Sequence, residues 1–415
     1  MFNILVRGGG FSNKGAEAML LTVKQELSKR LDSRFSAVVS PWETEACRAA
    51  GFAPVAANHA NILDKMAFSA RCLIREPGLF PLSLSSARTA RQMMALGQCD
   101  AVVDISGYAL GDSWGLQSAQ RTLTVLKCCK ENRKPFVFLP QAWGPFEMSE
   151  MVQTMREICQ AATLAYARDE ESLFWLRKVC NPGISVDLAP DIAFRFKADG
   201  AEAGERVLAD FGFDARRTPL VGITPNLRLY KRTSGQGGKN IYVETMVSVI
   251  RHCLSRFGAS VVLIPHMISA EKGPSGDDRY VCALLKSAFE AEARCVSLTR
   301  NYPPSALKAL IGRLQLLVGS RYHSLVAALS GKVPCVAVSW SHKYPELMRT
   351  LGVGQYSYDF SSSEKDLLKV LEMAWESREN IKSVIAERLN PIERQVDGVF
   401  DLVARTIKEN SALNG

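Results

Sequence analysis

Two cationic side chains and a histidine follow two apolar, strand-like segments in the C-terminal half of the chain. Arg321 and His323 come after Leu316–Gly319, on the turn into an apolar helix, and Lys343 comes shortly after Cys335–Val338. The carboxyl ends of parallel strands lie at one edge of their sheet, so these side chains are expected to gather there. Arginine and lysine suit carboxylates and phosphates. The pattern predicts a site for a small ligand with several negative charges.

An arginine also follows a strand-like segment in the N-terminal half. Arg168 comes directly after Leu164–Ala167 and is followed by the acids of Asp169–Glu171. These acids suit the first turn of a helix. Arg168 either presents its guanidinium to an anionic ligand or pairs with the neighbouring acids, and the sequence leaves both interpretations open.

Two glycine-rich segments of the same half, Gly8–Glu17 and Asp104–Asp112, also follow strand-like segments. Glycines let a backbone approach a ligand closely, and a helix that follows offers unpaired N–H groups. The chain has neither a P-loop nor a GxGxxG motif followed by a distant acid. The first segment therefore forms either part of a ligand site or only a tight turn.

The length of 415 residues exceeds one ordinary core and favours two domains. Hydrophobic residues make up 47% of the chain and charged residues 22%, which is typical of globular proteins. No apolar run reaches the roughly 18 residues that span a bilayer. The opening residues MFNILVRGGG are typical of a strand rather than a secretory signal. We expect a cytoplasmic protein, free or at the inner face of the plasma membrane.

The formal net charge of +9 admits nucleic acid, an anionic membrane surface or a phosphorylated ligand as partner. Nucleic-acid binding predicts Lys/Arg blocks interleaved with aromatic residues, which the sequence lacks. Segment Met66–Met94 mixes apolar residues with four arginines and follows Lys65. It is interpreted either as helices and a loop of the first domain or as a surface, over 65–91, that touches anionic lipid or a lipid-linked substrate.

The eleven cysteines are scattered and include no CxxC pair and no Cys/His cluster with zinc spacing. We expect them to be reduced and to act as small apolar core residues. Neither a disulfide framework nor a structural metal is expected.

Strand-like and helical segments alternate along the chain, which predicts an α/β fold with parallel sheets covered by helices. The polar, Gly- and Ala-rich stretch Ala198–Thr218 separates two halves. We expect two Rossmann-like domains facing across a cleft (GT-B-like), at 1–200 and 215–385, and a C-terminal helix at 386–415 that packs back on the first domain. The predicted strands are Phe2–Val6, Phe35–Val39, Ala101–Ile105, Phe136–Leu139, Leu164–Ala167, Ser185–Leu188, Leu220–Thr224, Ser260–Pro265, Cys295–Leu298, Leu316–Gly319 and Cys335–Val338.

Several of these segments resemble motifs of the polysaccharide pyruvyl transferase family. Gly319–Pro334 (GSRYHSLVAALSGKVP) resembles the family's RxHxxxxA signature, and Ser341–Val353 resembles its lysine-containing segment. Gly8–Leu20 is similar to the family's G-N-x-G-(D/E)-E-A segment, and Tyr166–Ser172 is similar to its (V/A)RDxxS element. The motifs also occur in the order that the family shows.

The resemblance implies a GT-B-like fold, phosphoenolpyruvate as donor, and a product in which pyruvate forms a cyclic ketal across two sugar hydroxyls. His323, Lys343 and Arg168 would be the catalytic and donor-binding residues, with Arg321 and Ser320 beside them. His323 would act as general acid or neutralise the leaving phosphate. Neither a metal nor another cofactor is expected, since the cations would take that role.

The acceptor implied by the resemblance is a sugar of a bacterial cell-surface or exopolysaccharide glycan, or its lipid-linked precursor. In this family the first domain shapes the acceptor side, and the departures from the family pattern fall there. Ala16 replaces a usual acid, and Ser106-Gly-Tyr replaces a Gly-Gly-Gly turn. The residues expected on the acceptor side are Gly9, Asn13, Glu17 and Asp112. Either Glu17 or Asp112 could take the sugar proton.

Two other functions stay open. A GT-B glycosyltransferase with a nucleotide-sugar donor would share the fold, although no acid is clearly placed to hold a ribose in the second domain. The chain could instead be a non-catalytic binding protein that recruits acceptor or partner enzymes to the membrane. Binding of phosphoenolpyruvate separates the two enzymes, and an effect of His323→Ala separates an enzyme from a binding protein.

Overall fold

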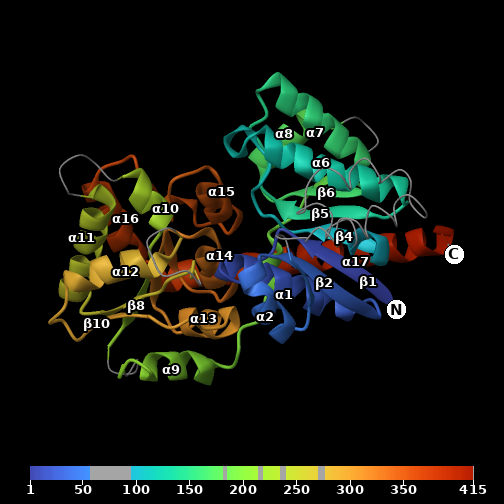
Figure 1. Ribbon diagram of the computed structural model, residues 1–415. Coiled ribbons are helices and arrows are strands. Elements are labelled where there is room, and N and C mark those ends of the chain that lie inside the picture. The colour runs from blue at the N-terminus through green and yellow to red at the C-terminus, as the bar shows by residue number, and fades with distance from the viewer. Residues whose placement is uncertain (57–94, 181–184, 214–217, 234–239, 270–275, 415) are drawn as a thin grey trace. The chain divides into compact units, whose positions relative to one another are not determined.

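The computed structural model describes residues 1–56, 95–180, 185–213, 218–233, 240–269 and 276–414 (Figure 1). The chain forms two compact units. Unit 1 comprises Met1–Phe11, Met19–Ile192 and Arg394–Gly415, and unit 2 comprises Ser12–Ala18 and Ala193–Glu393. The chain therefore passes between the units after residues 11, 18, 192 and 393. The segment predicted to form a basic, apolar surface lies outside the described residues.

Unit 1 contains a parallel seven-stranded sheet in the order β3-β2-β1-β4-β5-β6-β7. Its strands are β1 (Phe2–Arg7), β2 (Ser33–Val39), β3 (Ala53–Ala56), β4 (Ala101–Asp104), β5 (Phe136–Gln141), β6 (Leu164–Ala167) and β7 (Ser185–Leu188). Strands β4, β5 and β6 are buried along their whole length, as expected of apolar strands in a sheet covered on both faces. The strand order reverses between β1 and β4, and open α/β sheets bind ligands at the carboxyl ends of strands near such a point.

Helices join these strands and pack on the sheet. They are α1 (Lys14–Ser28, of which Met19–Ser28 lies in unit 1), η1 (Pro41–Glu43), α2 (Thr44–Ala49), η3 (Asp112–Trp114), α6 (Leu116–Glu131), α7 (Ser149–Ala161) and α8 (Glu170–Val179). Figure 1 shows α6, α7 and α8 stacked together beside β5 and β6. Helix α8 begins where predicted, because the Asp169 side chain accepts from the Ser172 backbone N–H at 2.8 Å.

Unit 2 contains a parallel six-stranded sheet in the order β10-β9-β8-β11-β12-β13. Its strands are β8 (Leu220–Thr224), β9 (Ser260–Leu263), β10 (Cys295–Ser297), β11 (Leu316–Gly319), β12 (Cys335–Ser339) and β13 (Ser357–Asp359). Its helices are η4 (Ile192–Arg195, from Ala193), α9 (Ala201–Ala209), α10 (Leu227–Arg232), α11 (Ile241–Ser255), α12 (Asp278–Ser287), α13 (Pro304–Ile311), α14 (Tyr322–Ser330), α15 (Lys343–Thr350), η5 (Gly354–Tyr356), α16 (Glu364–Glu376) and α17 (Arg378–Asn414, as far as Glu393). Each sheet follows the strand–helix alternation of the sequence.

The two parallel sheets confirm the predicted fold class, and all eleven predicted strands are present with small shifts at their ends. Strands β3 and β13 were not predicted. They are four and three residues long, and each lies at an edge of its sheet. Such short strands form because they pair with the edge of a longer neighbouring strand. Their own sequence therefore does not predict them.

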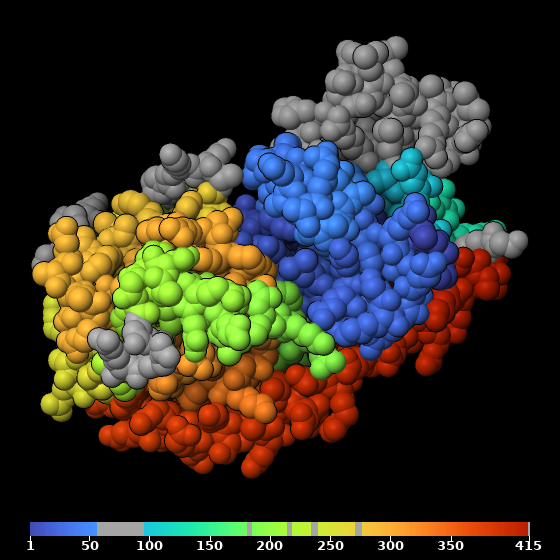
Figure 2. Space-filling view, turned by 90° about the horizontal axis from the view of Figure 1, so that it is seen from below, coloured from blue at the N-terminus to red at the C-terminus, as the bar shows by residue number. Residues whose placement is uncertain are grey.

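The predicted linker Ala198–Thr218 is wrong as a boundary between the units, because it contains α9 of unit 2. The Asp199 N–H donates to the Ser305 carbonyl at 3.2 Å. A Cβ atom on Gly204 would lie 2.7 Å from the backbone of Ala309, so α9 and α13 pack with almost no space between them. Figure 2 shows α9 in green across the orange residues of unit 2. The chain leaves unit 1 earlier, after Ile192.

The C-terminal helix α17 begins at Arg378, earlier than the predicted 386. From Arg394 onward it belongs to unit 1, where Arg30 Nε donates to Asp401 Oδ1 at 2.6 Å. Arg30, which lies in the turn after α1, also donates to the carboxylate of Glu26 in α1 at 2.9 Å. The end of α17 is thus held by an arginine that lies close to the ring of Phe400.

One cysteine pair departs from the prediction of reduced thiols. Cys159, in the last turn of α7, and Cys180, just after α8, form a disulfide with Cα atoms 5.5 Å apart. Eight other cysteines of the described chain are free and buried, as expected of small core residues. None of the helices in the described part of the chain combines the length and the hydropathy needed to cross a bilayer.

Candidate functional site

The strongest sequence motif lies at the carboxyl end of β11. The strand ends at Gly319, Arg321 caps α14 with an extended backbone, and His323 lies half-buried on the first helical turn. A Cβ atom on Gly319 would lie 2.7 Å from Leu325 Cδ2, so a larger residue would push the strand end away from the helix. The structure thus places His323 where a helix N-terminus meets the edge of the sheet.

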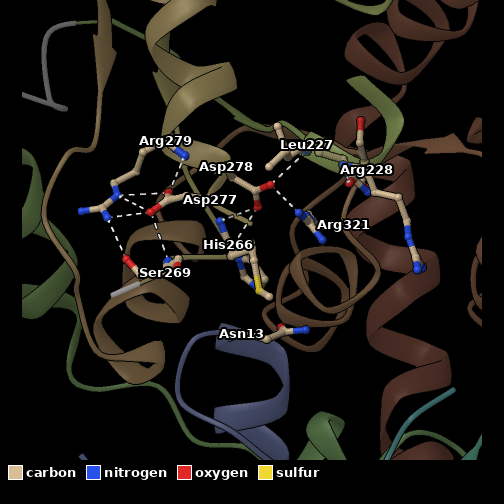
Figure 3. Close-up of polar contacts among 12 residues, drawn as sticks. Asn13, Leu227, Arg228, His266, Ser269, Asp277, Asp278, Arg279 and Arg321 are labelled. Carbon is tan, nitrogen blue, oxygen red and sulfur yellow. Dashed lines mark hydrogen bonds and ion pairs between the residues drawn. The ribbon is translucent and has the colours of Figure 1, made fainter. Parts of the chain in front are cut away.

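Arg321 is paired with a carboxylate that joins three strand ends (Figure 3). Arg321 Nη2 donates to Asp278 Oδ1, and Asp278 is fully buried at the start of α12. The same carboxylate accepts from the backbone N–H groups of Leu227 (3.0 Å), His266 (3.2 Å) and Met267 (2.8 Å). Burial disfavours the charge on Arg321, but Asp278 raises its pKa above the ordinary value. Arg321 therefore stays charged, and much of that charge is balanced inside the protein.

Ser320 is a buried hydrogen-bonding residue of the same turn. Its hydroxyl accepts from the Tyr242 hydroxyl at 2.9 Å. Its carbonyl accepts from Asn226 Nδ2 at 2.7 Å and from the Tyr344 hydroxyl at 3.0 Å. The side chain predicted to touch a donor is thus engaged with the protein interior, where it fixes the turn that carries Arg321.

Lys343 is the first residue of α15 and lies among aromatic rings. Its Nζ atom is 5.2 Å from the ring centre of Trp340, 5.6 Å from that of Tyr344 and 5.7 Å from that of Tyr322. The Tyr322 ring in turn lies 5.3 Å from the His323 ring. Tyr322 therefore connects the two predicted reactive residues.

Two further cations lie over Trp340 and were missed by the sequence interpretation. The guanidinium carbons of Arg232 and Arg228 are 4.7 Å and 5.8 Å from the Trp340 ring centre. Both arginines belong to α10, which follows β8. A pocket of about 410 Å³ adjoins this group, and its lining includes Arg232, Trp340, His342 and Asp359. Cations that follow three strands of unit 2 thus lie at one edge of the sheet, and the anion site itself stays a prediction.

The residues from Ser12 to Ala18 correct one prediction: they lie in unit 2, not in the acceptor-side domain. Asn13 forms an antiparallel bridge with Met267, and the Lys14 N–H donates to the His266 carbonyl at 3.0 Å. The Asn13 side chain accepts from the Gly15 N–H at 3.0 Å and so caps α1. A Cβ atom on Gly15 would lie 2.2 Å from Cγ of His323, so this glycine is in direct contact with the imidazole.

Glu17 was predicted as an acceptor-side residue and a candidate base. Its carboxylate accepts from Lys14 Nζ at 2.7 Å, and the Lys14 side chain is only 3% exposed. Glu17 therefore balances a buried lysine next to His323.

His266 was not chosen as a site residue from the sequence. It follows β9 and is almost fully buried, and burial, followed by the charges of His323, Arg321 and Lys14, lowers its pKa to about 3. It lines a small cavity of about 20 Å³ together with Lys14, Gly15 and His323. A neutral imidazole thus lies behind the predicted reactive histidine. In the sequence, His266 comes directly after the predicted strand Ser260–Pro265.

Arg168 belongs to unit 1, whereas Arg321, His323 and Lys343 belong to unit 2. Its Nη1 atom lies 3.1 Å from Asp191 Oδ2, and both side chains are almost fully buried. The interpretation that Arg168 pairs with its neighbours in the sequence is therefore wrong for Asp169, which caps α8 instead. Asp191 comes from the segment after β7, a partner that the local sequence did not indicate.

A second group of polar side chains lies at the carboxyl edge of the unit 1 sheet, where Arg168 follows β6. Arg7 ends β1 and lies 3.8 Å from Asp104, which ends β4. Gln141 ends β5 and is 1% exposed, yet neither its Oε1 nor its Nε2 atom has a hydrogen-bond partner in the described residues. This edge includes the reversal point between β1 and β4, where a ligand is expected.

Gly9 and Asp112, the other predicted acceptor-side residues, both have structural contacts in unit 1. A Cβ atom on Gly9 would lie 3.1 Å from Leu20 and 3.2 Å from Ile105. The Asp112 N–H donates to the Pro145 carbonyl at 3.0 Å, and its side chain accepts from the Glu147 N–H at 2.8 Å. Asp112 thus ties together the loops that follow β4 and β5.

Across the described residues, no group of three or more His, Cys, Asp or Glu side chains is placed to hold a metal ion. The charged site residues are cations and the carboxylates that balance them.

Two Rossmann-like units with polar residues at the carboxyl edges of parallel sheets define a GT-B-type protein. Solved structures agree with this class at the level of the fold. They include a UDP-bound Staphylococcus aureus MnaA (10% identity, TM-score 0.62, 98% of this chain and 97% of that one). They also include the UDP-GlcNAc 2-epimerase of Neisseria meningitidis (11% identity, TM-score 0.59, 97% and 100%).

Residues 13–342 match the model of the polysaccharide pyruvyl transferase family, so the chain belongs to that family. The match includes Arg168, Arg321 and His323 and ends just before Lys343. A characterised relative, the amylovoran biosynthesis protein AmsJ of Erwinia amylovora, is 22% identical over 268 residues. The aligned region covers 64% of this chain and 63% of AmsJ.

Proposed function

We propose that this protein transfers the pyruvyl group of phosphoenolpyruvate to a sugar of a bacterial exopolysaccharide or cell-surface glycan, forming a cyclic ketal and releasing phosphate. The observation that supports this most strongly is the arrangement of His323, Tyr322 and Lys343 at the carboxyl edge of the unit 2 sheet. It combines a proton donor and a cation at a half-buried position. Family membership and the likeness to an amylovoran biosynthesis protein support the same substrate class.

The donor carries a carboxylate and a phosphate, so it requires cations on more than one side. In this proposal Lys343, Arg228 and Arg232 bind the anionic groups. Arg321 contributes less directly, because Asp278 balances its charge and the pair fixes the turn before His323. Aromatic rings around Lys343 limit its hydration and strengthen its attraction to an anion.

The reaction then requires a proton at C3 of the enol. In this proposal His323 either donates that proton or neutralises the negative charge of the leaving phosphate. Protonation makes C2 electrophilic, one sugar hydroxyl adds to C2 and loses its proton, and the C2–O bond to phosphate breaks. The second hydroxyl then adds to C2 and loses its proton as the ketal closes. Of the two hydroxyl protons, one replaces the proton delivered to C3 and the other leaves with the phosphate. The cations stabilise the charge that develops on the departing phosphate.

Incubation with phosphoenolpyruvate and a panel of glycan acceptors tests the proposal. Phosphate release and a pyruvate-sized mass gain on one acceptor are expected, and His323→Ala should lower the rate about 100-fold or more. Stabilisation against heat by phosphoenolpyruvate, but not by nucleotide-sugars, separates this activity from that of a glycosyltransferase. The proposal is wrong if no acceptor releases phosphate and phosphoenolpyruvate does not bind.

A further inference from the structure

The side chain of Gln141 is the most unusual polar group of unit 1. It is 1% exposed, and both of its amide atoms lack a hydrogen-bond partner within the described residues. A buried amide without hydrogen-bond partners destabilises the folded state, and folding alone does not explain its presence. Buried polar side chains in native proteins nearly always have a partner, so an exception calls for an external one.

Gln141 ends β5 at the carboxyl edge of the sheet, the edge at which open α/β sheets bind ligands. Its carbonyl accepts from the Arg168 N–H at 3.1 Å, and the next residue, Ala142, donates to the Gly107 carbonyl at 2.8 Å. Gly107 has a positive φ of 71°, and a Cβ atom there would meet nothing closer than Arg168 Nη1 at 3.9 Å. Space is therefore available beside Gly107, next to a buried guanidinium and at the carboxyl edge of the sheet.

We propose that Gln141 binds the pair of acceptor hydroxyls on which the ketal forms. A primary amide presents a donor and an acceptor on adjacent atoms: Nε2 donates to one hydroxyl oxygen, and Oε1 accepts from the other hydroxyl. Two hydroxyls of one sugar ring, close enough to close a ketal, match that spacing. The Arg168–Asp191 pair lies at the same strand edge, because Arg168 directly follows Ala167, the residue of β6 that pairs with Gln141.

This inference rests on the proposed function, because only ketal formation requires two neighbouring hydroxyls. It assigns to Gln141 a specificity role that is separate from the donor residues of unit 2. It also explains why an uncharged residue stands at the end of β5, where β1, β4 and β6 are each ended or followed by a charged one.

The test compares Gln141→Met with Gln120→Met. Methionine has nearly the same shape as glutamine without its polar atoms, and Gln120 is an exposed residue of α6 in the same unit. Gln141→Met is expected to raise the KM for the sugar acceptor about tenfold and to leave the KM for phosphoenolpyruvate unchanged. Its melting temperature should equal or exceed that of the wild type, because an unpartnered amide has been removed. Gln120→Met should change none of these values.

A second measurement uses binding alone, so that it holds even if no phosphate is released. Titration calorimetry compares methyl glucoside and methyl galactoside with their 4-deoxy and 6-deoxy forms, in the wild type and in Gln141→Met. In the wild type, at least one deoxy sugar should bind about tenfold more weakly than its parent. In Gln141→Met the same deoxygenation should change affinity less than threefold, since the partner of that hydroxyl is gone. Gln141→Asn keeps the amide on a side chain that is one methylene shorter. Its loss of affinity on deoxygenation should lie between those of the wild type and Gln141→Met.

Several results would overturn the assignment. A melting temperature lowered by Gln141→Met with the acceptor KM unchanged would make the amide a structural group that holds an internal water. Equal penalties for deoxygenation in the wild type and the variant would place the hydroxyls elsewhere, and so would failure of the wild type to bind any of the sugars. If the sugars bind as expected in the wild type and the variant but no phosphate is released, the result would instead contradict the proposed donor chemistry.

Discussion

The carboxyl edges of the two sheets share one feature, an aspartate–arginine pair, but differ in the polar side chains around that edge. In each unit a buried aspartate holds an arginine: Asp191 with Arg168 in unit 1 and Asp278 with Arg321 in unit 2. In unit 2, half-buried or exposed cations and a histidine lie at the same sheet edge as the pair, whereas in unit 1 the strand next to Arg168 ends in Gln141, which carries a neutral amide. The two pairs are alike, and the polar side chains that share their edges differ in charge.

The difference follows from charge. A doubly anionic donor is attracted by cations that keep part of their charge unbalanced, as at the unit 2 edge. A neutral sugar gains little from such charge and is recognised by directional hydrogen bonds. Under the proposed function, the unit 2 edge would suit the anionic donor and the unit 1 edge would suit the neutral acceptor.

The largest expected effect tests whether Asp278 is structural. Asp278→Ala would leave Arg321 buried without its partner and three backbone N–H groups without an acceptor, so we expect a loss of about 3–5 kcal/mol of unfolding free energy in urea titration. Asp277→Ala, which removes the cap of α12, is the neighbouring control and should cost about 1–2 kcal/mol. Equal losses for the two variants would contradict the central place of Asp278.

Gly15 tests whether the position of His323 matters. Gly15→Ala places a methyl group against the imidazole, so phosphate release should fall about 100-fold while the fold persists. Gly398→Ala, inside α17 with no atom near its new methyl, should instead raise the unfolding free energy by about 0.5–1 kcal/mol. An unchanged rate for Gly15→Ala would remove His323 from the chemistry or show that its ring moves freely.

His266 should make unit 2 sensitive to acid. Because its pKa is about 3 in the folded state and about 6.5 in the unfolded one, only the unfolded state binds a proton between these values. Stability is thus complete above pH 6.5 and falls by about 1.4 kcal/mol per pH unit below it.

The measurement compares unfolding free energies at pH 7.5 and pH 5. His266→Gln should reduce the difference between these two values by about 2 kcal/mol relative to the wild type. His252→Gln, at a site paired with Glu372 on another face of unit 2, is the control. The same pH dependence in wild type and His266→Gln would refute the assignment of a neutral buried imidazole.

The smallest expected effect separates the cations of the unit 2 edge. Lys343→Met should raise the KM for phosphoenolpyruvate about tenfold, because the ammonium among three aromatic rings is lost. Lys231→Met, at an exposed position of α10, should change that KM less than twofold. Steady-state phosphate release measures both. If the two variants behave alike, Lys343 is not a donor residue.

The sequence was sufficient for much of the fold and indicated candidates for the site. Alternating apolar runs located eleven strands, and His323 and Lys343 were chosen because each follows such a run. The pairing of Asp278 and Asp191 with arginines, and the contact of Gly15 with His323, were not predicted because these residues meet only through the topology of the sheets. Gln141 gave no signal, since an unpartnered amide becomes visible only once its surroundings are known.

The short excursion of Ser12–Ala18 into unit 2 has a consequence for dissecting the protein. A fragment cut at 193–393 would contain the sheet, His323 and Lys343, but it would lack the backbone that pairs with Met267 and the glycine that rests on the imidazole. A fragment that ends at Ile192 would carry those seven residues without their partners. Unit 2 is therefore not encoded by one contiguous gene segment. A recombination or domain swap that preserves unit 2 has to transfer Ser12–Ala18 together with the second half of the chain.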